Sequence, residues 1–155
     1  AHGLPKKIIN KGDPYQHQIE VSAQAIAKKA DLSSETWIVC YQSRVGPLEW
    51  IGPSTDSILE EAGKGQREVV LLPIAFVSEH SETLVELDIE YKELAHQSGV
   101  KSYYRVPAVS THPSFISGLG DLILRSFEVQ PEGCSEIGVK LCKREHLFCP
   151  LVEIE

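Results

Sequence analysis

The sequence contains no methionine and begins AHGLP, so we expect a fragment or a processed product of a longer chain. It also lacks any run of about 18 consecutive apolar residues, which a membrane-spanning helix requires. Basic residues are too few for a broad positive face, since 15 lysines and arginines against 22 acidic residues give a net charge of −7. That balance argues against a nucleic-acid partner. We also expect no secretory signal peptide.

What is present indicates one globular α/β domain. Hydrophobic residues make up 42% and charged residues 24% of 155 positions, which suits a domain with its own core. Apolar spacing predicts helices over 12–30, 53–66, about 80–97 and 113–127, and strands over 36–42, 67–76 and 100–108. This alternation predicts a doubly wound parallel sheet of about four strands with helices on both faces. We assign residues 1–128 to this domain and 129–155 to a tail.

Helix ends carry their own signals. Asp13 before Pro14 is typical of a helix start, and Ser54 or Thr55 has the same role for the next helix. Gly99 follows the last periodic residue of the helix over about 80–97 and predicts its end. Short connections between such elements place three loops at the carboxyl ends of the strands, where ligands bind in parallel sheets. These loops are AHGLP, residues 42–50 and residues 76–80.

The helix predicted over about 80–97 is unusually acidic. At α-helical spacing, one set of carboxylates falls on a single stripe that contains no basic residue: Glu79, Glu82, Glu86, Glu90 and Glu93. Leu84, Leu87, Tyr91 and Leu94 form an apolar stripe for the core. Like charges four positions apart destabilise a helix by about 0.2–0.5 kcal/mol per pair. A solvated face is the ordinary explanation, but a path for a divalent cation or for protons would offset this repulsion.

Other side chains of the three loops also suggest a site. His2 stands in a tight Gly-Leu-Pro turn, His80 lies in the first turn of the acidic helix, and Trp50 lies between two Gly-Pro pairs. A histidine and a carboxylate together can accept protons or bind a transition metal. The four cysteines, Cys40, Cys134, Cys142 and Cys149, match no zinc-binding spacing, and we expect reduced thiols.

Five segments together resemble the carboxyl-terminal half of the ferrochelatase family. In chain order they are AHGLP, KGDPY, QSRVGPLEWIGPSTD, LLPIAFVSEHSETLVELDIEY and VPAVSTHPSF. The resemblance covers residues 1–127. It implies one of two similar α/β domains that enclose a porphyrin, and an enzyme that inserts ferrous iron into protoporphyrin IX or coproporphyrin to make haem. The missing amino-terminal half would form the other wall, so the fragment alone is expected to be inactive.

The resemblance also implies roles for particular residues. His2, His80 and Glu82 match the catalytic positions, and His2 and Glu82 match those that contact the metal. Glu79, Glu86 and Glu90 match an acidic relay, although the family more often has aspartate at the position of Glu79. The positions that line the porphyrin pocket are matched by Leu4, Ser43, Val45, Trp50 and Phe76. Whether His2 is an iron ligand or a proton acceptor stays open.

The remaining expectations concern partners and alternatives. Some ferrochelatases hold a [2Fe–2S] cluster near the carboxyl terminus, but the tail has three cysteines and no C-x-x-C pair, so we predict none. The expected location is the cytoplasm, with peripheral contact with the inner membrane as an alternative. Two other functions remain: a related chelatase for another tetrapyrrole or metal, such as cobalt and sirohydrochlorin, and a non-catalytic tetrapyrrole- or metal-binding module.

Overall fold

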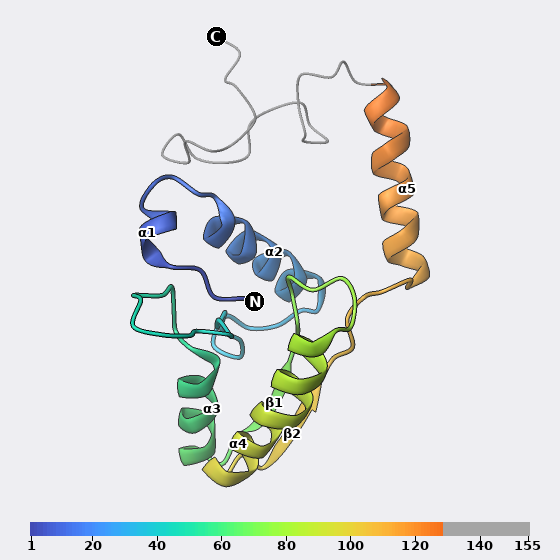
Figure 1. Ribbon diagram of the computed structural model, residues 1–155. Helices are drawn as coiled ribbons and strands as arrows, with labels where there is room; N and C mark the ends of the chain where they lie inside the picture. The colour runs from blue at the N-terminus through green and yellow to red at the C-terminus, as the bar shows by residue number, and fades with distance from the viewer. Residues whose placement is uncertain (129–155) are drawn as a thin grey trace.

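The computed structural model describes residues 1–128 and confirms the α/β class (Figure 1). In chain order the elements are α1 (Lys6–Ile9), α2 (Tyr15–Lys29), α3 (Thr55–Lys64), β1 (Glu68–Leu71), the π-helix η1 (Glu82–Glu90), α4 (Tyr91–Ser98), β2 (Ser102–Arg105) and α5 (Pro113–Glu128). The predicted tail, with Cys134, Cys142 and Cys149, lies outside the described residues. Among residues 1–128, no helix is both long and apolar enough to cross a membrane.

One pair of parallel strands forms the sheet within residues 1–128. β1 pairs with β2 in a register that runs from Glu68 opposite Ser102 to Leu71 opposite Arg105. The prediction of about four strands is therefore not met in this part of the chain. The strand expected over 36–42 is reduced to isolated bridges at Tyr41 and Gln42. An apolar run becomes a strand only where a neighbouring strand accepts its hydrogen bonds, and the sequence of the run does not supply that neighbour.

The sheet is covered on one face rather than on both. Val69, Leu71 and Tyr103 pack against a core made of Leu59, Leu87, Tyr91 and Ala95, which belong to α3, η1 and α4. On the opposite face, the paired residues Val70 and Tyr104 are 68% and 61% exposed. The continuous apolar pattern of residues 67–76 suggested burial on both faces. Within the described residues, only the helix-facing side has its cover.

Glycine at position 63 sets the distance between α3 and α4. A Cβ built on Gly63 would lie 2.1 Å from the carbonyl oxygen of Ser98, at the last turn of α4. No side chain fits in that space, so the two helices approach closely only because residue 63 has none. α4 continues η1 without a break in Figure 1, and this contact therefore anchors the far end of the acidic helix.

A second core lies between α2 and the loops that carry His2 and Trp50. Ile19, Tyr41 and Ile51 are buried there, and Leu4 is among the side chains packed against them. Ile19, Ala23 and Ala27 form the buried face of α2, whereas Ile26 is 40% exposed. The loop segments are fixed by backbone hydrogen bonds, including Ile51 N–H to the Leu4 carbonyl at 3.0 Å.

The helix ends largely follow the sequence signals. Ser54 caps α3 by accepting a hydrogen bond from the Ser57 N–H at 3.2 Å. Gly99 ends α4 in the left-handed conformation, with φ of 90°. Asp13 accepts from the Tyr15 N–H at 2.9 Å, while Pro14 precedes the first helical residue instead of occupying it.

α5 has no buried residue within residues 1–128, although it is 16 residues long. It extends away from the sheet in Figure 1. Its large exposed apolar side chains are Ile116, Leu119, Leu122, Ile123, Leu124 and Phe127.

Candidate active site

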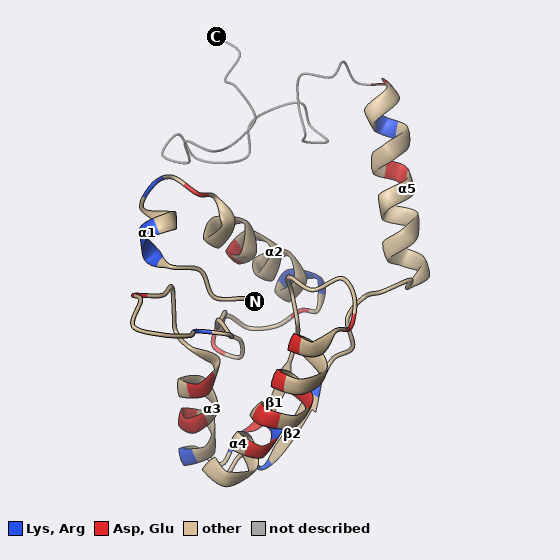
Figure 2. Cartoon of the chain, in the orientation of Figure 1, with Lys and Arg blue, Asp and Glu red and all other residues tan. Residues whose placement is uncertain are grey.

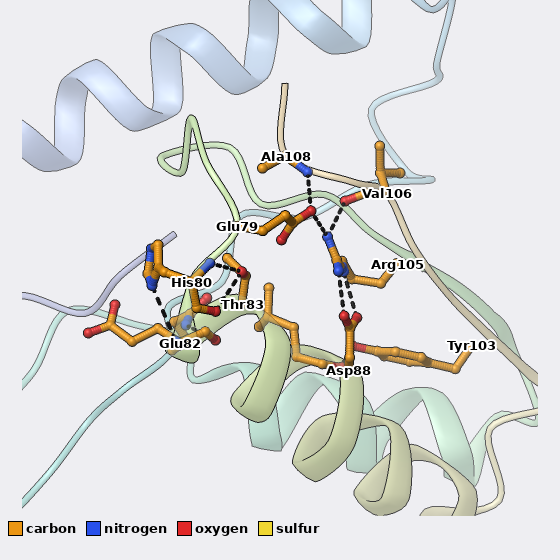
Figure 3. A network of polar contacts seen from close by, with 11 residues as sticks. Glu79, His80, Glu82, Thr83, Asp88, Tyr103, Arg105, Val106 and Ala108 are labelled. Carbon is orange, nitrogen blue, oxygen red and sulfur yellow. Dashed lines mark hydrogen bonds and ion pairs between the residues drawn. The ribbon is translucent and has the colours of Figure 1, made fainter. Parts of the chain in front are cut away.

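Two predicted catalytic residues meet beyond the carboxyl end of the sheet. His2 Nε2 lies 4.0 Å from Glu82 Oε2, and the two side chains are 40% and 46% exposed. His80 is two residues before Glu82 and shares its turn, as Figure 3 shows. The three side chains come from segments about 80 positions apart in sequence, so only the fold brings His2 to the other two.

The turn after His2 is held by close backbone contacts. Gly3 N–H donates to the Gln42 carbonyl at 2.7 Å, and a Cβ on Gly3 would lie 2.8 Å from that same oxygen. Glycine is therefore required for this approach. Tyr15 donates its hydroxyl to the His2 carbonyl at 3.0 Å, which ties the start of α2 to the same turn.

The hydrogen bonds of the two histidines assign their neutral tautomers. His2 Nδ1 lies 2.7 Å from the Gly3 carbonyl oxygen, which only accepts, so Nδ1 carries the proton and Nε2 has the lone pair. The His80 ring has the opposite arrangement, because the Glu82 N–H donates to Nδ1 at 3.2 Å and leaves the proton on Nε2. His2 thus presents a base or metal ligand toward Glu82, and His80 presents a donor.

The acidic helix begins as a π-helix. Thr83 is fully buried, and its hydroxyl bonds both the N–H and the carbonyl of His80, fixing the first turn. The Tyr91 N–H reaches the carbonyl of Glu86, five residues earlier, which is the π pattern. This wider turn buries Thr83 and Leu87 but leaves Leu84, predicted for the core, 46% exposed.

Glu86 accepts hydrogen bonds from four uncharged donors. Its Oε1 accepts from the Ser43 N–H at 2.7 Å and from the Tyr91 hydroxyl at 2.9 Å. Its Oε2 accepts from the Gln42 side chain at 2.8 Å and from the Ser43 hydroxyl at 2.5 Å. Burial, with a smaller contribution from Glu86, raises the pKa of Tyr91, so its phenol remains a donor. Ser43 has φ of 58°, a strained conformation that aims its N–H at the carboxylate.

Glu90 lies about one helical turn after Glu86. Both line an open pocket of about 380 Å³, together with Asp56 and Val45. Figure 2 shows the acidic residues following one another along η1 and α4. Glu82, Glu86 and Glu90 recur every four residues along η1, which is the spacing that the relay prediction requires. The prediction itself concerns proton or metal transfer and stays a prediction.

The residues predicted to line the porphyrin pocket lie in different surroundings. Phe76 packs on His80 with ring centroids 5.0 Å apart, and Ser43 binds Glu86. Val45 is 75% exposed, whereas Leu4 is half-buried against the core under α2. Trp50 bridges to Pro5, and within residues 1–128 its buried Nε1 has no hydrogen-bond partner.

Glu79 lies apart from the other acidic residues predicted for the relay. It precedes the helix and pairs with Arg105, whose Nη1 is 2.5 Å from Glu79 Oε1. Arg105, followed by the Thr83 hydroxyl and the Ala108 N–H, lowers the pKa of Glu79 to about 2. The sequence pattern showed no cation on the acidic stripe, because Arg105 comes from β2.

Four contributors to this region were not predicted from the sequence: Arg105, Asp88, Gln42 and Tyr15. Each acts through a contact between distant segments, and no local spacing marks them. Tyr15, Gln42 and Asp88 do stand in segments of the family resemblance, whereas Arg105 lies just outside them. Within residues 1–128, no three histidine, cysteine or acidic side chains are grouped as a metal site.

Comparisons with known proteins identify the family of this chain. The family model described as Ferrochelatase matches residues 1–127. The chain is 57% identical over 128 residues to the ferrochelatase of Pelagibacter ubique, covering 83% of this chain and 37% of the relative. It is 50% identical over 153 residues to that of Caulobacter vibrioides strain NA1000, covering 99% and 44%, and 43% identical over 152 residues to that of Rickettsia bellii, covering 96% and 43%.

The chain spans less than half the length of each of these relatives. The match nevertheless includes every segment that carries His2, His80 and Glu82, since these lie within residues 1–127. With identities of 43–57% in three relatives and a family match over most of its length, this chain belongs to the ferrochelatase family.

Proposed function

We propose that this chain forms the metal- and proton-handling half of a ferrochelatase, which inserts ferrous iron into protoporphyrin IX or coproporphyrin. The observation that carries the proposal is the approach of His2 Nε2 to Glu82 Oε2 at 4.0 Å, with both side chains partly exposed. Family membership supports the reaction class, and the His2 and Glu82 side chains suit it. The relatives' greater length supports a second half that completes the porphyrin site.

The chemistry of His2 and Glu82 fits metal insertion into a free-base porphyrin. Two pyrrole N–H protons must leave the macrocycle, and His2 presents an unprotonated Nε2 that accepts one. Glu82, beside it, stabilises the resulting imidazolium or takes the proton onward. Ferrous iron accepts imidazole and carboxylate ligands, so the same two side chains suit its approach.

The carboxylates that follow Glu82 along η1 supply a path by which protons leave or ferrous iron approaches. Glu86 and Glu90 continue from Glu82 along η1 toward the pocket that Asp56 and Val45 also line. Four donors hold Glu86 in place, so its position is fixed. Phe76 packs on His80 and Trp50 lies beside Gly3, so these two rings are the proposed walls for the macrocycle. Rigid walls favour a bent porphyrin with accessible nitrogens.

We further propose that the enzyme is cytoplasmic, with peripheral contact with the inner membrane as the alternative, and that it holds no [2Fe–2S] cluster. Iron content and visible absorption of the anaerobically purified full-length protein test the latter. Two non-haem irons per chain, lost on substitution of Cys142 by serine, would contradict it.

The deciding experiment is anaerobic metallation by the full-length protein that carries this chain. Ferrous iron, cobalt and zinc are each offered with protoporphyrin IX, coproporphyrin and sirohydrochlorin. We expect turnover of ferrous iron with one of the two porphyrins. Turnover of sirohydrochlorin with cobalt alone would favour the related chelatase, and porphyrin binding without turnover would favour a binding module.

A further inference from the structure

Arg105 joins three segments that surround the proposed site. Its Nε donates to Asp88 Oδ1 at 2.6 Å, its Nη2 bonds Asp88 Oδ2, and its Nη1 reaches Glu79 Oε1 at 2.5 Å (Figure 3). Asp88 belongs to η1, Glu79 to the loop after β1, and Arg105 to the end of β2. The Arg105 side chain is only 11% exposed, so this guanidinium is held within the fold rather than on its surface.

The far end of the network is also closed. Glu79 Oε1 accepts a second hydrogen bond, from the Ala108 N–H at 2.8 Å. Arg105 Nη1 additionally donates to the Val106 carbonyl at 3.4 Å. The backbone that leaves β2 is therefore tied to the loop that leads into the acidic helix. A planar guanidinium with bidentate geometry suits this task, and a lysine ammonium does not reproduce it.

The two carboxylates bracket the reactive turn. Glu79 immediately precedes His80, and Asp88 lies in the second turn of η1, with Glu82 between them in sequence. Fixing both flanks fixes the path of the backbone through His80, Glu82 and Thr83. The bond from the Glu82 N–H to His80 Nδ1, which sets the tautomer of His80, depends on this path.

We propose that Arg105 is a positioning residue for the metallation site: by clamping Glu79 to Asp88 it holds His80 in its tautomer and Glu82 at His2. This inference rests on the proposed function. Arg105 bonds Glu79, Asp88 and Val106, and in the described residues none of its hydrogen bonds goes to His2, His80 or Glu82. It therefore acts through the two carboxylates, not on the reacting atoms.

A purely structural salt bridge would behave differently. The Glu79 and Asp88 side chains are 31% and 34% exposed, so solvent partly screens their attraction to Arg105. The clamp carboxylate Glu79 stays ionised near neutral pH because its pKa is held at about 2, so the clamp does not open in the range where histidines titrate. A constant clamp suits positioning better than proton transfer.

The test compares Arg105→Met and Arg105→Lys with Arg67→Met in the full-length protein. Arg67 is exposed and lies at the opposite, amino end of β1, which makes it the matched control. We expect Arg105→Met to lower kcat for metallation about 10–100-fold with the KM for porphyrin little changed, because removing outer partners of a metal site has effects of this size. Arg105→Lys should recover part of this loss, and Arg67→Met should match the wild type.

A spectroscopic readout separates positioning from stability. The ¹⁵N shifts of the His80 imidazole should report the Nε2–H tautomer in the wild type and a mixture of tautomers in Arg105→Met. If Arg105→Met does not fold, Glu79→Gln replaces it, since glutamine keeps the shape and loses the ion pair. A combined Arg105→Lys and Glu79→Gln variant should lose no more activity than the worse single variant.

The outcomes distinguish the two proposals. A wild-type protein that metallates no porphyrin overturns the proposed function and this inference with it. An active wild type whose folded Arg105→Met variant keeps kcat within about twofold, with an unchanged His80 tautomer, overturns the clamp alone. Reduced thermal stability at wild-type kcat would likewise mean a structural salt bridge only.

Discussion

The carboxylates of Glu79 and Glu82 are three positions apart and lie in opposite electrostatic surroundings. Glu79 is bound by a guanidinium and a backbone N–H, and its pKa is held at about 2. Glu82 faces His2 across 4.0 Å and is about half exposed. Between these extremes, Glu86 accepts four hydrogen bonds from neutral donors.

The difference shows that a run of acidic residues is not one functional unit. A carboxylate with a fixed cation holds neighbouring segments in place, since its charge is constant. A carboxylate that faces a histidine can exchange a proton with it, because neither group is bound to a fixed counter-ion. Substitutions of these glutamates by glutamine should therefore differ in whether they change activity or stability. Four of them test the contrast, at Glu82, Glu86, Glu79 and Glu90.

The largest effect is expected for Glu82→Gln. Glutamine has the same shape but accepts no proton and balances no cation, so kcat for metallation should fall about 100-fold or more. Stability should change by less than about 0.5 kcal/mol, because the side chain is about half exposed. Single-turnover metallation and thermal unfolding measure the two quantities.

The matched control for Glu82→Gln is Glu93→Gln, on the same helix but one turn into α4. Its side chain is exposed and bonds only Gln97 at 3.0 Å among the described residues. Turnover near the wild-type rate is expected there. Equal turnover in both variants would remove the functional meaning of the His2 and Glu82 approach.

Glu86→Gln should act mainly on stability. The amide NH₂ of glutamine would face donors such as the Ser43 N–H and the Tyr91 hydroxyl, which leaves at least one of them unpaired. An unpaired buried donor costs about 1–3 kcal/mol of unfolding free energy. Activity should fall less than in Glu82→Gln. Urea unfolding gives the stability, and a wild-type unfolding midpoint would show that these contacts are not formed in solution.

Glu79→Gln should show a pH dependence of stability. Its pKa is lowered in the fold from 4.5 to about 2, so the ionised carboxylate stabilises the protein above its unfolded pKa. The wild-type advantage over Glu79→Gln should be constant near neutral pH and should disappear as pH falls from about 4.5 to about 2. Urea unfolding over this range measures it, and an advantage that grows in acid would exclude the ion pair.

The smallest effect is expected for Glu90→Gln. Glu90 is exposed and stands four positions after Glu86, so removing its charge relieves a repulsion of about 0.2–0.5 kcal/mol. The variant should be slightly more stable and lose less activity than Glu86→Gln. A loss as large as that of Glu82→Gln would instead place Glu90 in an obligatory path.

Local features of the fold were predictable from sequence, whereas contacts between segments were not. Gly99 and Ser54 mark helix ends because the stopping and capping interactions involve near neighbours. The strand over 36–42 was wrong for most of its length because strand pairing depends on a distant partner. β1 covers only four residues of the predicted 67–76, since Pro73 has no N–H for a ladder.

The site shows the same division. His2, His80 and Glu82 were identified through family segments, and the fold places His2 at Glu82. The helical stripe that included Glu79 was wrong in geometry, because η1 is a π-helix and Glu79 precedes it. Arg105 follows Asp88 by 17 positions, so charge spacing along one helix could not reveal their pairing.

A substitution at Gly63, far from His2 and Glu82 in the sequence, should still alter their arrangement. A methyl group at this position would meet the Ser98 carbonyl, so α3 and the end of α4 would have to separate. Because η1 and α4 form one continuous helix, a displacement at the end of α4 would also tilt the start of η1, where Glu82 lies. Gly63 therefore helps to set the orientation of the acidic helix, although it has no side chain.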